Sequence, residues 1–188
     1  MKILSGKFKG KSLVSFKDKS VRPTLGVVKE AVFNICRDVV QKCCFLDAFA
    51  GSGSMGFEAL SRGAASATFI DSSIKSIKII RSNAKLLQTE DQVIVLNKDV
   101  IAGFRRLQHQ GRKFHIIYMD PPYVIADTFL EKVLLELVNT NLLESNARIF
   151  LEKASSKEIV VNGLISKNQR KFGDSFLFEY QLAETENI

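Results

Sequence analysis

The chain has 188 residues, 46% hydrophobic and 25% charged, so we expect one domain with a buried core and exclude disordered, collagen-like and coiled-coil classes. The formal net charge is +7, and residues 1–45 carry all of it, with 10 of the 27 basic and 3 of the 20 acidic side chains. A neutral body with a basic N-terminal segment predicts a polyanionic partner and favours nucleic acid, although basic surfaces also serve solubility alone.

The first expected element is a basic β-hairpin. Residues 2–4 and 12–16 have the pattern of short extended segments, and two glycines bracket the lysines between them. A loop is expected over 20–24, and apolar residues at helical spacing then predict a helix over 26–40. We therefore expect an extension over residues 1–24 and the main domain over 25–188. The candidate contacts to nucleic-acid phosphates in this extension are Lys7, Lys9, Lys11 and Arg22.

The rest of the chain alternates between strands and helices. Strands are predicted over 43–48, 67–70, 93–96, 114–119, 148–151 and 176–180, and helices over 54–62, 73–87, 100–110 and 128–138. This alternation is typical of an α/β fold with a mostly parallel twisted sheet and helices on both faces. Ligands of such sheets bind at the carboxyl ends of the strands, so the residues that follow each strand are the functional candidates.

A glycine-rich loop follows the first of these strands. Gly51, Gly53 and Gly56 form the pattern G-x-G-x-x-G between a strand and a helix, with Ser52 between the first two glycines. Such a loop is typical of sites for NAD, FAD or S-adenosylmethionine, because glycine lets the backbone approach a ligand closely. The alternative is a glycine-rich connection that binds no ligand. Asp47 precedes the glycines, and its carboxylate would repel a pyrophosphate but attract an ammonium group. This favours S-adenosylmethionine, unless Asp47 only caps the turn.

Two further carboxylates follow the next two strands. Asp71 lies where a ribose would be bound through its hydroxyl groups, and the alternative is an N-cap for the helix that follows. Asp99 lies where it would accept a hydrogen bond from an adenine amino group, and an N-cap explains it equally well.

The most specific motif is Asp120-Pro121-Pro122-Tyr123, directly after the strand over 114–119. The two prolines fix the backbone and remove two N–H donors, so the loop presents mainly hydrogen-bond acceptors beside an aromatic ring. Acceptors and a stacking surface suit a planar exocyclic amino group, and hydrogen bonds to them strengthen as the amine attacks an electrophile. The alternative is an ordinary proline turn at the end of a strand.

These motifs together resemble the class I S-adenosylmethionine-dependent methyltransferases that modify amino groups of bases. The N-terminal part resembles the RsmD family in particular. The residues that carry this second resemblance are Gly6-Lys7-Phe8-Lys9-Gly10-Lys11 with Leu13, Arg22-Pro23-Thr24, Val28-Lys29-Glu30 and Phe33-Asn34. The resemblance covers nearly the whole chain, although Lys9 stands where an arginine is common and the end of the chain matches weakly.

The resemblance implies a Rossmann-like class I methyltransferase fold over 25–188. It also implies methyl transfer from S-adenosylmethionine to N2 of a guanine in 16S rRNA, with the small ribosomal subunit or its assembly intermediate as partner. In the cofactor, the methionine part would contact Asp47 and the Gly51-Ser52-Gly53 loop, the ribose Asp71 and the adenine Asp99. The target guanine would lie against residues 120–123.

Three alternatives stay open on the sequence alone. The first is a DNA or other RNA amino-methyltransferase, for which a chain of this length leaves no target-recognition domain. The second is a nicotinamide oxidoreductase, which would leave the Asp120 motif without a role. The third is a non-catalytic RNA-binding module with a relic cofactor pocket.

The remaining features predict a soluble cytoplasmic monomer without a signal peptide, a membrane span or a metal. The cysteines, Cys36, Cys43 and Cys44, lack the spacing of a disulfide framework or a zinc site, so we expect free thiols. His109 and His115 lack metal-ligand spacing and are expected to be structural or on the surface.

Overall fold

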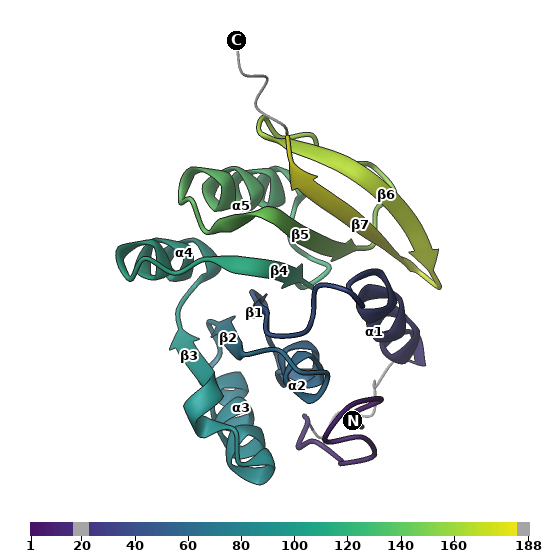
Figure 1. The fold of residues 1–188 in the computed structure, drawn as a ribbon. Helices are drawn as coiled ribbons and strands as arrows, with labels where there is room; N and C mark the ends of the chain where they lie inside the picture. The colour runs from purple at the N-terminus through teal and green to yellow at the C-terminus, as the bar shows by residue number, and fades with distance from the viewer. Residues whose placement is uncertain (17–22, 184–188) are drawn as a thin grey trace.

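The computed structural model describes residues 1–16 and 23–183, and its core is a seven-stranded sheet between two layers of helices (Figure 1). The strands are β1 Cys44–Asp47, β2 Ser66–Asp71, β3 Val93–Asn97, β4 Phe114–Met119, β5 Leu143–Lys153, β6 Leu164–Phe172 and β7 Ser175–Leu182. The helices are α1 Pro23–Ile35, α2 Ser54–Ser61, α3 Ile74–Leu87, α4 Val100–His109 and α5 Asp127–Asn139, with a short 3₁₀ turn at Glu90–Gln92.

The strand order β3-β2-β1-β4-β5-β7-β6 places the point where the chain reverses its direction of growth between β1 and β4. The strands from β3 to β5 pair in parallel, and β7 pairs antiparallel with both β5 and β6. The predicted mostly parallel sheet is thereby confirmed. In such sheets the crevice at the reversal point, at the carboxyl ends of the strands, is the usual ligand site.

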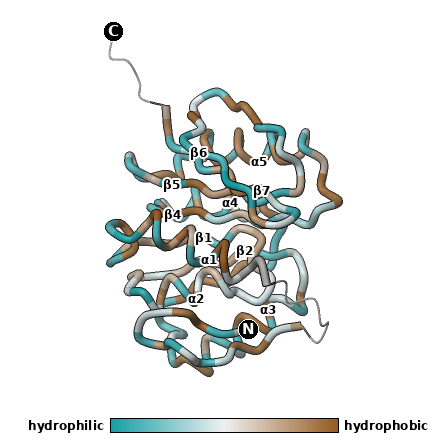
Figure 2. Tube along the Cα trace, turned by 90° about the vertical axis from the view of Figure 1, so that its right-hand side faces the viewer, coloured by the Kyte–Doolittle hydropathy of each residue, from teal (hydrophilic) through white to brown (hydrophobic). Residues whose placement is uncertain are grey.

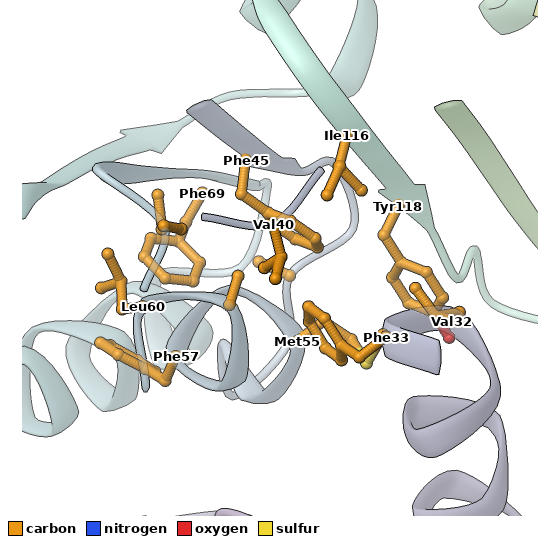
Figure 3. Packing of buried hydrophobic residues seen from close by; sticks show 14 of the residues in the cluster. Val32, Phe33, Val40, Phe45, Met55, Phe57, Leu60, Phe69, Ile116 and Tyr118 are labelled. Carbon is orange, nitrogen blue, oxygen red and sulfur yellow. The ribbon is translucent and has the colours of Figure 1, made fainter. Parts of the chain in front are cut away.

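Alternating apolar side chains fill both faces of the sheet. In β1, Phe45 belongs to the hydrophobic core beneath α1, α2 and α3, whereas the next residue, Leu46, belongs to the core beneath α4 and α5. Ile116 and Ile117 of β4 divide between the two cores in the same way. Figure 3 shows the first core, with side chains of β1, β2 and β4 directed toward α1 and α2. Burial on both faces explains why these strands lack a polar side.

The N-terminal segment is packed onto this body. Ile3, Phe8 and Leu13 are buried in the core beneath α1 to α3, and the segment lies beside α2 and α3 (Figures 1 and 2). The predicted hairpin is reduced to one antiparallel bridge between Lys2 and Ser12, because the glycine turns between them take up most of its length. The division at residues 24 and 25 stays a prediction, and Arg22 lies outside the described residues.

Three elements differ from the prediction by more than two residues. The edge strand β6 was not predicted, because its exposed polar side chains do not have the apolar pattern of a strand. β5 begins at Leu143, before the predicted 148–151, because Leu143 already pairs with Phe114 of β4, ahead of an irregularity in the register. α1 covers Pro23–Ile35 instead of 26–40, with Pro23 as its first residue, a position where the missing N–H costs nothing. None of the described helices is long and apolar enough to cross a membrane.

Candidate active site

A cavity of about 590 Å³ opens at the carboxyl ends of β1, β2, β3 and β4. Most of the predicted site residues share it, although Gly53 does not line it. Those that line it are Asp47, Gly51, Ser52, Asp71, Asp99, Asp120, Pro121, Pro122 and Tyr123. Residues from four separate strand ends therefore meet in one chamber, as the parallel sheet requires.

Asp47 is a buried acid at the base of this cavity. The last residue of β1, it is 2% exposed, and its Oδ2 accepts a hydrogen bond from the Gly56 N–H at 3.2 Å. Burial raises the pKa of the Asp47 carboxyl to about 8; the Gly56 hydrogen bond opposes this rise, and the carboxylates of Asp120 and Asp71 add to it. Asp47 therefore does cap the turn that follows β1, which was the alternative role considered for it. A cationic ligand group would stabilise the charged form of this acid.

The glycine loop has a backbone conformation that glycine adopts readily. Gly51 and Gly53 have φ angles of 54° and 78°, which favour glycine. A Cβ atom on Gly53 would also lie 2.8 Å from the Phe57 ring, and one on Gly56 would lie 2.3 Å from the Phe69 ring. The first glycine therefore shapes the cavity wall, whereas the second and third let α2 pack closely on β2.

Asp71 joins the glycine loop to β2. Its Oδ2 accepts from the Gly51 N–H at 2.8 Å, and its Oδ1 accepts from the Ser73 N–H at 2.7 Å. Each carboxylate oxygen has two acceptor sites, so Asp71 keeps the capacity to bind a diol. The predicted N-cap of α3 is Ser73 instead, since its side chain accepts from Ser76. Asp99 does cap α4 by accepting from the Ala102 N–H at 2.9 Å, and it also lines the cavity.

The loop after β4 is the open side of the site. Asp120 is half-buried and Pro121 is buried, whereas Tyr123 is 44% exposed. The Ile125 N–H donates to the Pro122 carbonyl at 2.9 Å, which closes a turn with Tyr123 in it. A second cavity of about 200 Å³, bordered by the ion pair of Asp127 and Lys153, lies against the same loop and shares its prolines and Tyr123. The loop thus has open space on two sides.

A buried hydrogen-bonded pair next to this loop, Tyr118 and Glu152, was not predicted from the sequence. The Tyr118 hydroxyl donates to Glu152 Oε2 at 2.6 Å, and the Ser175 hydroxyl donates to Glu152 Oε1 at 2.7 Å. Tyr118 and Glu152 both line the large cavity. Burial raises the pKa of Tyr118 well above its usual range, so the phenol stays protonated and keeps donating to Glu152. Tyr118 and Glu152 each directly follow a short apolar run, residues 116–117 and 149–151, and this is the sequence signal for the pair.

The N-terminal segment completes the cavity wall. Met1 and Phe16 line it, and the backbone near both residues is fastened to the body. The buried Asn83 of α3 accepts from the Val14 N–H at 2.7 Å and donates to the carbonyls of Val14 and Ser52 at 3.0 and 3.1 Å. The extension and the glycine loop are therefore joined through one side chain.

Glu58 provides the second attachment. It is fully buried in α2. Its two carboxylate oxygens accept from the N–H groups of Leu4 and Ser5 at 2.8 and 3.0 Å, and Oε1 also accepts from Arg62 at 2.9 Å. Glu58 is the one charged residue of α2, and a lone charge among small and apolar residues is a sequence signal for such a cluster.

The predicted phosphate contacts of the extension lie on the outside of the molecule. Lys7, Lys9 and Lys11 are exposed around the turn of this segment. The ammonium groups of Lys7 and Lys11 lie 5.2 and 5.4 Å from the centre of the Phe8 ring, which anchors the turn in the core. The segment therefore presents three cations on a fixed base.

The cysteines and His115 play structural parts. Cys36 and Cys43 are buried free thiols, and burial raises the pKa of each to about 12, which suppresses the reactive thiolate. His115 Nδ1 accepts a hydrogen bond from the Cys44 N–H at 3.2 Å. Among the residues that the structure describes, no group of three or more His, Cys, Asp and Glu side chains is arranged to hold a metal ion.

The cavity has the size and chemistry that S-adenosylmethionine requires. Cofactor pockets span about 300–1,000 Å³, and this one lies within that range. Asp47 offers a buried partner for a cation, Asp71 offers acceptors for a diol, and Asp99 offers a carboxylate oxygen beside the third strand. An acid next to the glycine loop, Asp47, disfavours a pyrophosphate there, so the residues fit a positively charged nucleoside better than a dinucleotide.

Known proteins show the same fold. The Escherichia coli protein yhhF has a structure with a TM-score of 0.83 and 26% identity, covering 98% of this chain and 99% of that chain. SMU.776, whose crystal structure is a complex with SAH, has a TM-score of 0.70 at 13% identity, and the match covers 93% of this chain and 52% of that chain. The predicted class I methyltransferase architecture is confirmed by these likenesses.

The sequence also matches curated relatives along most of its length. The ribosomal RNA small subunit methyltransferase D of Buchnera aphidicola subsp. Baizongia pistaciae is 32% identical over 176 residues, which cover 91% of this chain and 86% of that protein. The family described as Conserved hypothetical protein 95 matches residues 1–181. The resemblance to the RsmD family is thereby confirmed, and the chain belongs to this family.

Proposed function

We propose that the protein transfers a methyl group from S-adenosylmethionine to the exocyclic N2 of a guanine in 16S rRNA. The observation that carries this proposal is the shared cavity, in which the Gly51 loop and the Asp120–Tyr123 loop face one space of about 590 Å³. The names of the curated relatives support ribosomal RNA of the small subunit as the substrate.

The cofactor would lie along the carboxyl ends of β1, β2 and β3. S-adenosylmethionine supplies an electrophilic methyl group on a sulfonium when it is bound. Asp47 would hold the ammonium of its amino-acid end, Asp71 the ribose hydroxyls and Asp99 the adenine amino group. The Gly51-Ser52-Gly53 loop would keep the backbone close to this ligand, as its φ angles allow.

The base would enter from the side of Tyr123. An exocyclic amine is a poor nucleophile because its lone pair is delocalised into the ring. Asp120 and the carbonyl groups of the proline loop accept hydrogen bonds from the amine, and these strengthen as positive charge develops on the nitrogen. Tyr123, exposed at the rim, would stack on the base. The methylated amine is acidic enough to lose its proton to water, and no side chain forms a covalent bond.

The exposed lysines of the extension would dock the RNA. Lys7, Lys9 and Lys11 lie on a segment whose residues Met1 and Phe16 also border the cavity, so RNA held by the lysines would lie near the site of reaction. The target base has to leave any stack to enter the cavity, which costs least in an RNA loop.

The test is methyl transfer from labelled S-adenosylmethionine to ribosomal RNA and to small-subunit particles, followed by nucleoside analysis. N2-methylguanosine is the expected product, and DNA should not be labelled. N6-methyladenosine or labelled DNA would favour another amino-methyltransferase. Binding of cofactor and RNA without any transfer would favour the RNA-binding module.

A further inference from the structure

A buried lysine lies directly behind the glycine loop and takes no part in the function proposed so far. Lys29 of α1 is 1% exposed, and its Nζ donates to the Ser54 hydroxyl at 2.6 Å. The same Nζ lies 3.7 Å from Glu58 Oε2. Burying an ammonium group costs several kcal/mol unless it is paired, so this position calls for a functional or structural reason.

Ser54 connects Lys29 to the cavity. It is the first residue of α2, is 6% exposed, and lines the cavity beside Asp47. Its hydroxyl oxygen accepts from the lysine, which leaves the hydroxyl hydrogen available to donate. A hydroxyl that accepts from an ammonium group is polarised, and it becomes a stronger donor to an anion.

The cavity is lined mainly by acidic side chains, so a bound carboxylate has few positively charged partners in it. Five acidic side chains line the cavity, whereas Lys98 is the one lysine among the described lining residues, and it is exposed next to Asp99. The acidic lining side chains are Asp47, Asp71, Asp99, Asp120 and Glu152. The amino-acid end of the cofactor carries a carboxylate next to its ammonium group. If Asp47 holds the ammonium, the carboxylate needs positive potential close to Asp47.

We propose that Ser54 binds the carboxylate of the cofactor's amino-acid end, and that Lys29 positions and polarises the Ser54 hydroxyl for this contact. Ser54 and the N-terminus of α2 then supply donors where Asp47 supplies an acceptor, so both ends of the zwitterion are matched. The inference rests on S-adenosylmethionine as the cofactor but not on the identity of the methylated base.

Glu58 keeps this arrangement in place. Burial lowers the pKa of Lys29, and the charges of Glu58 and Asp47 oppose that decrease. Glu58 also accepts from Arg62 and from the backbone of the N-terminal segment, so it stays paired when Lys29 is replaced. A Lys29 variant is therefore expected to fold.

The test compares two ligands, S-adenosylmethionine and its decarboxylated analogue, by calorimetry without RNA. The wild-type protein should bind the decarboxylated analogue about tenfold more weakly, because the charge-assisted hydrogen bond is missing. Ser54→Ala should abolish most of this discrimination. Lys29→Met should also abolish most of the discrimination between the two ligands. Lys29→Arg should keep it, because the positive charge remains. The loss should appear in the affinity for S-adenosylmethionine, with little change in the affinity for the analogue.

Asp71→Asn is the matched control, because both ligands carry the ribose. It should weaken both to a similar extent and leave their ratio unchanged. The inference is overturned if the wild type does not discriminate, or if Ser54→Ala keeps the wild-type ratio. If Lys29→Met fails to fold, Ser54→Ala alone decides. A wild-type protein that binds neither ligand would instead contradict the cofactor in the proposed function.

Discussion

The two walls of the cavity differ in how firmly they are built. On one wall, Asp47 and Asp71 accept hydrogen bonds from the backbone of the glycine loop and of α2, and Asn83 ties the same loop to the N-terminal segment. On the other wall, Tyr123 is 44% and Val124 93% exposed, and the loop borders two cavities.

The difference is explained by the ligand that each wall is proposed to bind. A small cofactor of fixed shape is bound best by a prearranged wall, because little entropy is then lost on binding. A base that arrives on a large RNA needs an open rim and a loop that prolines hold without closing over it. Changes to the first wall should therefore alter binding of the cofactor, and changes to the second should alter turnover.

The largest expected effect is on turnover, from Asp120→Ala. Loss of a preorganised acceptor for the developing charge should lower the rate of methyl transfer by about 10²-fold or more. Binding of S-adenosylmethionine should stay near the wild-type affinity, because the proposed contact of Asp120 is with the base and not with the cofactor. Single-turnover transfer to rRNA and calorimetry measure the two quantities. Near wild-type turnover would contradict the proposed role of Asp120.

Asp71→Ala should act on the opposite wall. The loss of charge-assisted hydrogen bonds to the ribose should weaken cofactor binding by about 1.5–3 kcal/mol. Because the carboxylate also accepts from the Gly51 and Ser73 N–H groups, the variant should have a lower melting temperature as well. Calorimetry and thermal denaturation test both effects. Unchanged affinity would rule out Asp71 as the ribose ligand.

Tyr123 separates stacking from hydrogen bonding on the open wall. Tyr123→Ala should lose stacking worth roughly 1–3 kcal/mol, whereas Tyr123→Phe should keep most of the activity because the ring remains. The ratio of kcat/KM values for the two variants, with rRNA as the varied substrate, measures the contribution of the ring. If both variants were equally inactive, the hydroxyl and not the stacking surface would be essential.

The pKa of Asp47, raised to about 8, predicts a pH dependence of the first wall. An ammonium group favours the ionised acid, so cofactor affinity should rise by up to about tenfold per pH unit until about pH 8. In the free protein the sign is opposite. Between the unfolded value of 3.8 and about 8, the folded state keeps a proton that the unfolded chain releases, so this contribution to stability falls as pH rises.

Asp47→Asn cannot ionise, so it should remove both dependences and weaken binding. Calorimetry and urea denaturation across this pH window compare the variant with the wild type. A wild-type affinity that does not change with pH would argue against an ammonium partner for Asp47.

The smallest expected effect is that of the exposed lysines. Replacing Lys7, Lys9 and Lys11 by alanine should weaken RNA binding and reduce its salt dependence, by about 0.7–0.9 of a slope unit for each phosphate that a lysine no longer neutralises. Cofactor affinity should not change, since none of these three lysines lines the cavity. RNA binding measured over a series of salt concentrations provides the slope, and an unchanged slope would place the docking surface elsewhere.

The alternation of strands and helices, and the residues at the strand ends, could be predicted from the sequence. Buried parallel strands have short apolar runs, and the glycine loop and the Asp120 loop follow two of them directly. Because the carboxyl ends of parallel strands lie on one edge, Asp47, Asp71 and Asp120 could be expected to meet. The edge strand β6 could not be predicted in this way, because its exposed polar residues break the apolar pattern.

The contacts between residues far apart in the sequence could not be predicted and are seen only in the folded structure. Lys29 and Ser54 are 25 residues apart, Tyr118 and Glu152 are 34 apart, and Val14 and Asn83 are 69 apart. Helical or strand periodicity marks which residues are buried, but it does not specify which buried polar groups face each other. That depends on how the helices are rotated and on the register between strands, and these are set by packing across the whole core.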